Sequence, residues 1–190
     1  TSGVLDRRRA RSGHATRPPA GGVDGAWKMG EVLAERTLAE VRGLSLTGRV
    51  VSGVASVEVP LPELQVRVSD GLRLRPWLGR LLLRVGERAR LQGLRLGEAV
   101  WLSTPCDYSG ELALELEDQL GWRAGRVAVT SFNGDYLGYV VPSRYYDMPG
   151  YETRTMSFFG PQLPEAFSAL LRGMAERLER GGWPGVGETR

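Results

Sequence analysis

Residues 99–132, AVWLSTPCDYSGELALELEDQLGWRAGRVAVTSF, decide the fold class of this chain. The stretch begins with a short, almost entirely apolar run at 99–103, which is typical of a strand in a sheet covered on both faces. Ser109 then offers a helix N-cap, and leucines recur every fourth residue from 112 to 120. A second apolar run follows at 126–132. Strand, helix and strand in such close succession predict a βαβ unit with a right-handed parallel crossover.

Further helices and strands are predicted on both sides of this unit. Apolar residues at helical spacing predict helices over 27–42, 77–90 and 163–180, the last packed on the sheet by an amphipathic face. Residues 48–75 alternate with a period of two between prolines and an Asp-Gly pair, which predicts antiparallel strands or hairpins. The sequence therefore predicts an α/β fold, with a mixed sheet that contains the βαβ unit and is flanked by helices.

The domain organisation follows from length and local composition. A chain of 190 residues sets a prior of one domain, which we expect over residues 26–180. Residues 1–25 are rich in Arg, Gly and Pro and predict a flexible basic arm, and the glycine-rich residues 181–190 predict a flexible tail. The sequence begins at Thr1 without an initiator methionine, so we expect a processed chain or a part of a longer one.

Composition excludes several classes of protein. Apolar residues make up 42% of the chain, yet no run of 18 apolar residues exists, which excludes a transmembrane helix. The net charge is only +3 and the arginines are spread along the chain, so we expect no nucleic-acid partner. Cys106 is the single cysteine and His14 the single histidine. These counts exclude an internal disulfide and a zinc site built from several histidines of this chain alone.

Candidate site residues follow the two strands of the βαβ unit. Ligands of parallel sheets bind beyond the carboxyl ends of the strands. This rule places Cys106, Asp107 and Tyr108 at one strand end, and the segment 133–136 at the neighbouring one. A tyrosine-rich loop over 131–161 comes next, and long loops after such units commonly carry function.

The motifs of this loop resemble those of the neutral/alkaline ceramidase family. Asn133 is followed by Tyr136-x-x-Tyr139, then by Tyr146, and by a Tyr151-Glu152 pair twelve residues after Tyr139. An aromatic-Gly-Pro triplet at 159–161 precedes the last helix, as in that family. Upstream, the family has an apolar strand that ends in Pro-Gly-Glu-aromatic, and this chain has Pro-Cys-Asp-Tyr at 105–108. The resemblance covers residues 95–178, whereas residues 25–94 match only in their order of a helix and then strands.

The resemblance implies a zinc amidohydrolase that cleaves the N-acyl bond of a ceramide or a related lipid amide. Family members hold zinc with two histidines, one carboxylate and one tyrosine. Carried over, the carboxylate ligand is Asp107 and the tyrosine ligand is Tyr139, while Tyr151 helps to bind the reacting carbonyl. The two histidines are then expected N-terminal to Thr1, from a segment or chain that completes the active site.

The same resemblance sets expectations for the whole protein. This chain would be the C-terminal part of a larger catalytic domain, and no immunoglobulin-like domain is expected in its sequence. An extracellular, periplasmic or surface-attached location is also implied.

Two departures from the family pattern leave alternatives open. Asp107 stands where the family has Glu, and Cys106 replaces a glycine beside it. The Cys106 thiol could be a metal ligand, although a small buried residue is the favoured interpretation. The alternatives to the amidase are an inactive ceramidase-like scaffold or binding protein, and an N-terminal-threonine hydrolase whose nucleophile is Thr1. Metal analysis separates the three, because only the amidase requires zinc.

Overall fold

The structure, a computed structural model, describes residues 22–45, 50–69, 71–121 and 126–181. The chain divides into two compact units, residues 1–48 and 49–190. The described part of the first unit contains helix α2 (Gly22–Arg42), which begins five residues before the helix predicted at 27–42. The predicted arm lies outside the described residues except for its last four, and the predicted tail lies outside them except for Gly181.

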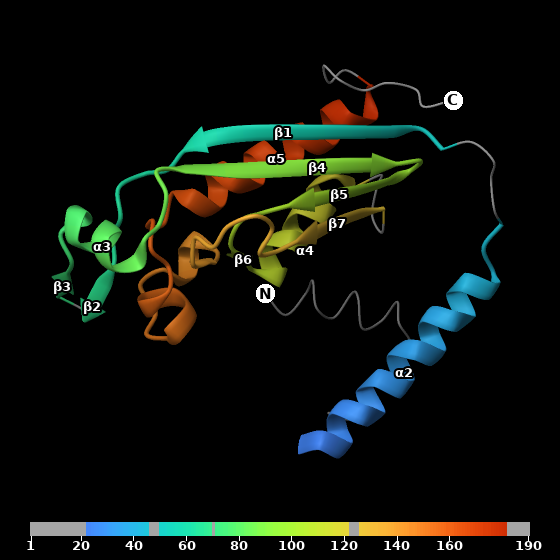
Figure 1. Cartoon of the computed structure of the whole chain (residues 1–190), viewed down its shortest axis with the longest axis horizontal. Coiled ribbons are helices and arrows are strands. Elements are labelled where there is room, and N and C mark those ends of the chain that lie inside the picture. The colour runs from blue at the N-terminus through green and yellow to red at the C-terminus, as the bar shows by residue number, and fades with distance from the viewer. Residues whose placement is uncertain (1–21, 46–49, 70, 122–125, 182–190) are drawn as a thin grey trace. The chain divides into compact units, whose positions relative to one another are not determined.

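The second unit is organised around a four-stranded mixed sheet, drawn as flat arrows in Figure 1. Its strand order is β1 (Ser52–Pro60), β4 (Arg88–Leu96), β5 (Ala99–Ser103) and β7 (Val127–Thr130). The pairs β1–β4 and β4–β5 are antiparallel, whereas β5 and β7 are parallel neighbours. Helix α4 (Gly110–Gln119) connects the two parallel strands. The predicted α/β fold, with its mixed sheet and βαβ unit, is confirmed.

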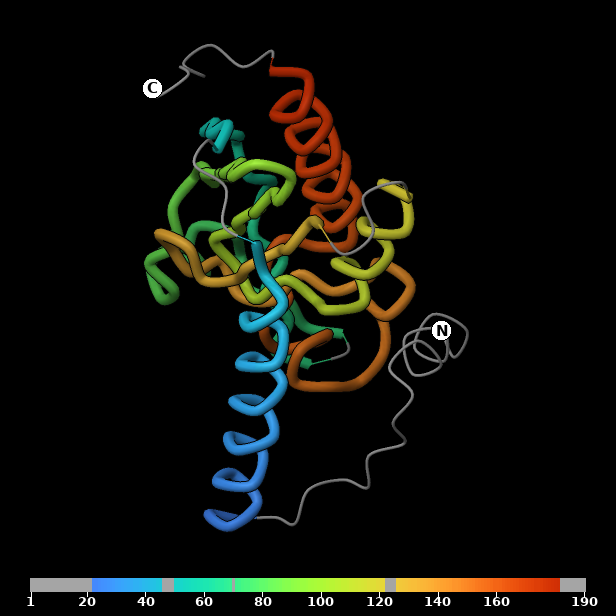
Figure 2. Tube along the Cα trace, turned by 90° about the vertical axis from the view of Figure 1, so that its right-hand side faces the viewer, coloured from blue at the N-terminus to red at the C-terminus, as the bar shows by residue number. Residues whose placement is uncertain are grey.

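One face of this sheet is covered by α4 and by the last helix, α5 (Leu163–Glu179), which runs beside the strands in Figures 1 and 2. The core between the layers includes Leu91, Leu102, Phe167 and Leu171, all almost fully buried. Gly93 of β4 allows this close approach, because a Cβ there would lie 2.7 Å from Leu178 Cδ1 of α5. Helix α5 therefore packs directly against the backbone of β4 at Gly93.

The segment predicted as a helix over 77–90 is two elements. Helix α3 (Pro76–Leu83) ends at Arg84, which adopts a left-handed conformation with φ 51°. Strand β4 then begins at Arg88, and its residues alternate between exposed and buried as far as Gly93. The helical prediction fails for residues 84–90. The side chains of residues 88–90 fit either period, and their antiparallel pairing with β1 makes them part of the strand.

The residues between β1 and α3 form a small hairpin of β2 (Arg67–Ser69) and β3 (Leu72–Arg73). The predicted antiparallel hairpin in 48–75 is thus present, while β1 pairs with the later strand β4. A third, two-stranded parallel sheet joins β6 (Asp107–Tyr108) to β8 (Tyr139–Val140). No immunoglobulin-like sandwich occurs in the described part of the chain. Among the described residues, no helix combines the length and apolarity that crossing a membrane requires.

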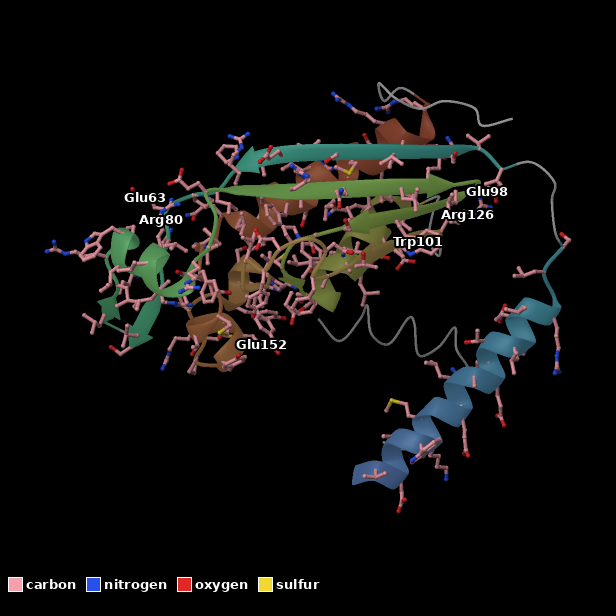
Figure 3. All side chains as sticks on the ribbon, in the orientation of Figure 1. Glu63, Arg80, Glu98, Trp101, Arg126 and Glu152 are labelled. Carbon is pink, nitrogen blue, oxygen red and sulfur yellow. The ribbon has the colours of Figure 1, made fainter. Side chains whose placement is uncertain are left out.

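An ion pair marks the sheet end that lies away from the tyrosine-rich loop. Arg126 Nη1 lies 3.2 Å from Glu98 Oε2 and links the β4–β5 turn to the start of β7. Figure 3 shows these two residues at one end of the sheet, and Glu152 of the loop toward the other. The strands β5 and β7 therefore run from the ion pair toward the loop.

Candidate active site

The candidate site forms where β5 and β7 end. Beyond their ends the Phe132 amide donates to the Cys106 carbonyl at 3.1 Å, so the two chain segments stay paired. The Asp107 amide then donates to the Gly138 carbonyl at 2.9 Å, and the parallel pair β6–β8 begins. In this pair Asp107 lies opposite Tyr139. Backbone hydrogen bonds thus bring both predicted metal ligands to one place.

The side chains of this pair also interact. Both residues are half-buried. The pKa of the Tyr139 phenol is raised to about 12, chiefly because it hydrogen-bonds to Asp107, and further by burial and by the negative charge of that carboxylate. At neutral pH the phenol is therefore protonated and donates to the carboxylate. The phenol of Tyr139 and the carboxylate of Asp107 are therefore neighbours across the β6–β8 pair.

Tyr151 approaches this pair from the loop. It begins a single turn of π-helix, η3 (Tyr151–Thr155), which follows a short 3₁₀ turn, η2 (Ser143–Tyr145). The ring of Tyr151 meets the ring of Tyr139 edge-on, with centroids 5.9 Å apart and planes at 78°. Tyr151 remains 62% exposed, so its hydroxyl is accessible to a ligand. The structure thus brings together the three residues to which the family resemblance assigns a role.

Two further aromatic residues belong to the site, and one of them, Phe132, carries no signal in the sequence. Phe132 has a left-handed backbone with φ 60°, is 57% exposed, and stacks on Tyr136 with centroids 5.7 Å apart. Burial and the charges of Tyr151 and Asp107 raise the pKa of Tyr136, which places its phenol within electrostatic reach of both. In the sequence Phe132 looks like the last residue of a strand. Its strained backbone and outward ring are visible only in the structure.

Two neighbours have structural roles. Cys106 is fully buried, and burial raises the pKa of its thiol to about 12, so the thiol stays protonated at neutral pH. This agrees with the small buried residue that the sequence favours. The Asn133 side-chain amide donates to Thr130 Oγ1 at 2.9 Å and to the Ser131 carbonyl at 3.0 Å. Asn133 therefore shapes the turn that leads to Tyr139.

The donor set suits part of a zinc site. Within the described ranges no three His, Cys, Asp or Glu side chains gather to hold a metal ion, and His14 lies outside those ranges. Asp107 and Tyr139 supply one carboxylate and one phenol oxygen, two of the four ligands of a tetrahedral zinc ion. This pair fits zinc if the remaining ligands come from elsewhere.

Comparison with known proteins supports the fold. No protein-family profile matches the chain, and no curated protein matches it. A solved structure described as "Ceramidase complexed with C2" is 21% identical and covers 50% of this chain and 15% of that one, with a TM-score of 0.44. The neutral ceramidase from Pseudomonas aeruginosa is 16% identical over 86% of this chain, with a TM-score of 0.52.

The second similarity covers 35% of the Pseudomonas protein, so this chain spans about a third of that protein's length. At such low identity the similarity concerns the fold alone. The chain has the fold of part of a neutral ceramidase.

Proposed function

We propose that this chain is part of the catalytic domain of a zinc-dependent amide hydrolase, which acts on a ceramide or a related lipid amide. Asp107 and Tyr139 would be its two metal ligands, and Tyr151 a hydrogen-bond donor to the substrate. The observation that carries the proposal is the pairing of Asp107 with Tyr139 across β6 and β8, with the Tyr151 ring against Tyr139. The fold shared with part of a neutral ceramidase supports it.

Asp107 and Tyr139 would hold the ion together, and the Tyr139 phenol would lose its proton on ligating. Because the pKa of that phenol is raised to about 12, metal binding would strengthen as pH rises. When bound, zinc would polarise the amide carbonyl and lower the pKa of a water molecule. The two histidines of the set would come from a preceding segment or a separate chain.

Tyr151 would stabilise charge on the substrate. Its ring is fixed edge-on by Tyr139 while its large exposed fraction leaves the hydroxyl free to meet a ligand. As water attacks the amide carbon, negative charge grows on the carbonyl oxygen. A tyrosine hydroxyl that donates to this oxygen stabilises the transition state more than the ground state. The exposed rings of Phe132 and Tyr136 supply apolar surface next to this position.

Zinc binding by the completed enzyme, with the preceding segment or chain present, tests the ligand assignment. We expect the parent to bind zinc with release of a proton and with a change in tyrosine absorbance, and more strongly at pH 8 than at pH 6. Asp107→Ala removes one donor and should abolish this binding. Asp118→Ala, on the exposed face of α4, is the matched control and should bind as the parent does. Equal zinc binding by Asp107→Ala and the parent would contradict the assignment.

Amide hydrolysis by the completed enzyme tests Tyr151. Tyr151→Phe keeps the ring and removes only the donor, so we expect turnover of a short-chain ceramide to fall about 10²–10³-fold. The melting temperature should stay nearly constant, because the ring contact with Tyr139 remains. A rate within about threefold of the parent, equal to about 0.6 kcal/mol, would remove Tyr151 from the mechanism.

A further inference from the structure

Arg67 of β2 is a buried arginine that reaches the loop of Tyr151. Its side chain is only 7% exposed. The guanidinium carbon lies 3.8 Å from the centroid of the Tyr146 ring. One of its nitrogens, Nη2, donates both to the Tyr146 carbonyl, at 2.6 Å, and to the Thr153 carbonyl. A single guanidinium therefore joins two points of the loop that are seven residues apart.

The segment between these two points contains Tyr151. Thr153 Oγ1 donates to the Met148 carbonyl at 2.7 Å, and the Arg154 amide donates to the Gly150 carbonyl at 2.9 Å. These bonds close the turn internally but do not connect it to the rest of the unit. Arg67 makes that connection, since it lies on the separate hairpin of β2 and β3. The turn that carries Tyr151 is thus bonded to a side chain that lies 84 positions before Tyr151 in the sequence.

The burial of Arg67 is not explained by a balanced ion pair. Its acidic neighbour is Asp147, at 3.7 Å from Nη1, and the Asp147 side chain is 95% exposed, so solvent screens the pair. Within the described ranges, Arg67 Nε is buried without a hydrogen-bond partner. Burial of a charged group is unfavourable unless strong bonds compensate for it. For Arg67 the compensating interactions are the bonds to the loop carbonyls and the contact with the Tyr146 ring.

We propose that Arg67 is the positioning residue of Tyr151: by bridging the Tyr146 and Thr153 carbonyls it holds the Tyr151 ring against Tyr139. The planar guanidinium can stack on a ring and donate to two carbonyls together, whereas a lysine ammonium cannot reproduce this arrangement. The placement of the ring stands on the structure alone. Its consequence for catalysis rests on the function proposed above.

Ring contacts in the full chain test the placement. We expect a nuclear Overhauser cross-peak between the ring protons of Tyr139 and Tyr151, assigned with Tyr151→Phe, because the rings meet edge-on. Arg67→Met keeps the stem of the side chain and removes the guanidinium, so the cross-peak should disappear. Arg73→Met is the matched control, because Arg73 is the partner of Arg67 in the hairpin and is exposed. It should retain the cross-peak.

Arg67→Lys is the second test variant, for the case that Arg67→Met does not fold. It keeps the charge and the aliphatic stem but lacks the planar fork, so we expect it to lose the cross-peak as well. The dispersed signals of the core methyl groups report folding in each variant. Retention of the cross-peak in a folded Arg67→Met or Arg67→Lys protein overturns the proposal.

A double-mutant cycle in the completed enzyme tests the catalytic consequence. Arg67→Met should lower kcat for amide hydrolysis about 10²–10³-fold, as Tyr151→Phe does, with KM little changed. The double variant should be no slower than either single variant, because both changes remove the same interaction. Multiplying effects would reject a role through Tyr151. If the parent hydrolyses no amide, the proposed function fails, while the cross-peak still decides the placement.

Discussion

Asp107 and Tyr139 are held by strands, whereas Tyr151 is held by a loop. The first two residues sit opposite each other in β6 and β8, and backbone hydrogen bonds on both sides fix their positions. Tyr151 follows a turn that is tied to the rest of the unit by the long side chain of Arg67. The two parts of the site should therefore respond differently to mutation.

The difference concerns what each part depends on. A backbone ladder tolerates most side-chain changes, because its hydrogen bonds come from the main chain. A loop held by one buried guanidinium can be released by a single substitution while the strands stay intact. A single substitution should therefore displace Tyr151 without moving Asp107 and Tyr139.

The largest effect is expected at Gly138, where the two parts meet. Its φ of 77° is left-handed, and a Cβ there would collide with the Met156 carbonyl and lie 2.7 Å from Phe158 Cδ2. The Met156 carbonyl cannot retreat without loss of the hydrogen bond, 2.8 Å long, that it accepts from the Tyr139 amide. We expect Gly138→Ala to lower the free energy of unfolding by about 3 kcal/mol, measured by urea denaturation.

Gly134 provides the control for this substitution. It also has a positive φ, 85°, but a Cβ added at this residue would meet no atom within 4 Å. Gly134→Ala should therefore lower the free energy of unfolding by only about 1 kcal/mol, the conformational cost alone. Equal losses in the two variants would show that the contact between β8 and the returning loop is not tightly packed.

The strand-borne half of the site could be predicted from the sequence. Apolar runs, the Ser109 cap and the leucine repeat are local signals, and together they placed β5, α4 and β7 correctly. Parallel strands expose their carboxyl ends at one edge, so Asp107 and the residues after β7 had to be neighbours. The motif resemblance, which the shared fold supports, added Tyr139 to this edge.

The loop-borne half could not be predicted in the same way. Alternation of Leu64, Val66 and Val68 predicts that Arg67 points to solvent, but Arg67 is buried and Val68 is 57% exposed. The register of the β2–β3 hairpin is irregular between Arg67 and Ser69. The Arg67 side chain packs on the Tyr146 ring of the loop. Such a contact joins residues far apart in the chain, and no local periodicity encodes it.

An effect of intermediate size is expected on the pKa of Tyr139 when Asp107 is replaced. The pKa of its phenol is about 12 because of Asp107, so Asp107→Asn should move it down toward the ordinary value near 10. Tyrosinate absorbance at 295 nm measures this change. Tyr108, whose pKa burial also raises to about 12, should not shift and serves as the internal reference.

The same pKa fixes how stability depends on pH. Because the folded-state pKa of Tyr139 lies above its unfolded value, its contribution to stability is full below about pH 10 and is lost as pH rises to about 12. Arg67→Met should move this titration far less than Asp107→Asn does, because Tyr151 is the smallest of the influences that raise the pKa of Tyr139. A shift in Arg67→Met as large as the shift in Asp107→Asn would mean that the two parts of the site are not independent.

The smallest effect is expected at Ser109, which joins β6 to α4. Its Oγ accepts a hydrogen bond from the Glu111 amide at 3.3 Å and caps the helix, while its own amide donates to the Val140 carbonyl at 3.0 Å. Ser109→Ala removes the cap and keeps the backbone bond, so we expect a loss of about 1 kcal/mol in the free energy of unfolding. Ser109→Thr retains a capping hydroxyl and should lose less. If the pair of Asp107 and Tyr139 depends on the backbone ladder alone, the titration of Tyr139 stays at its raised pKa in both variants. If that pKa falls in Ser109→Ala but not in Ser109→Thr, the capped start of α4 also helps to hold Asp107 and Tyr139 together.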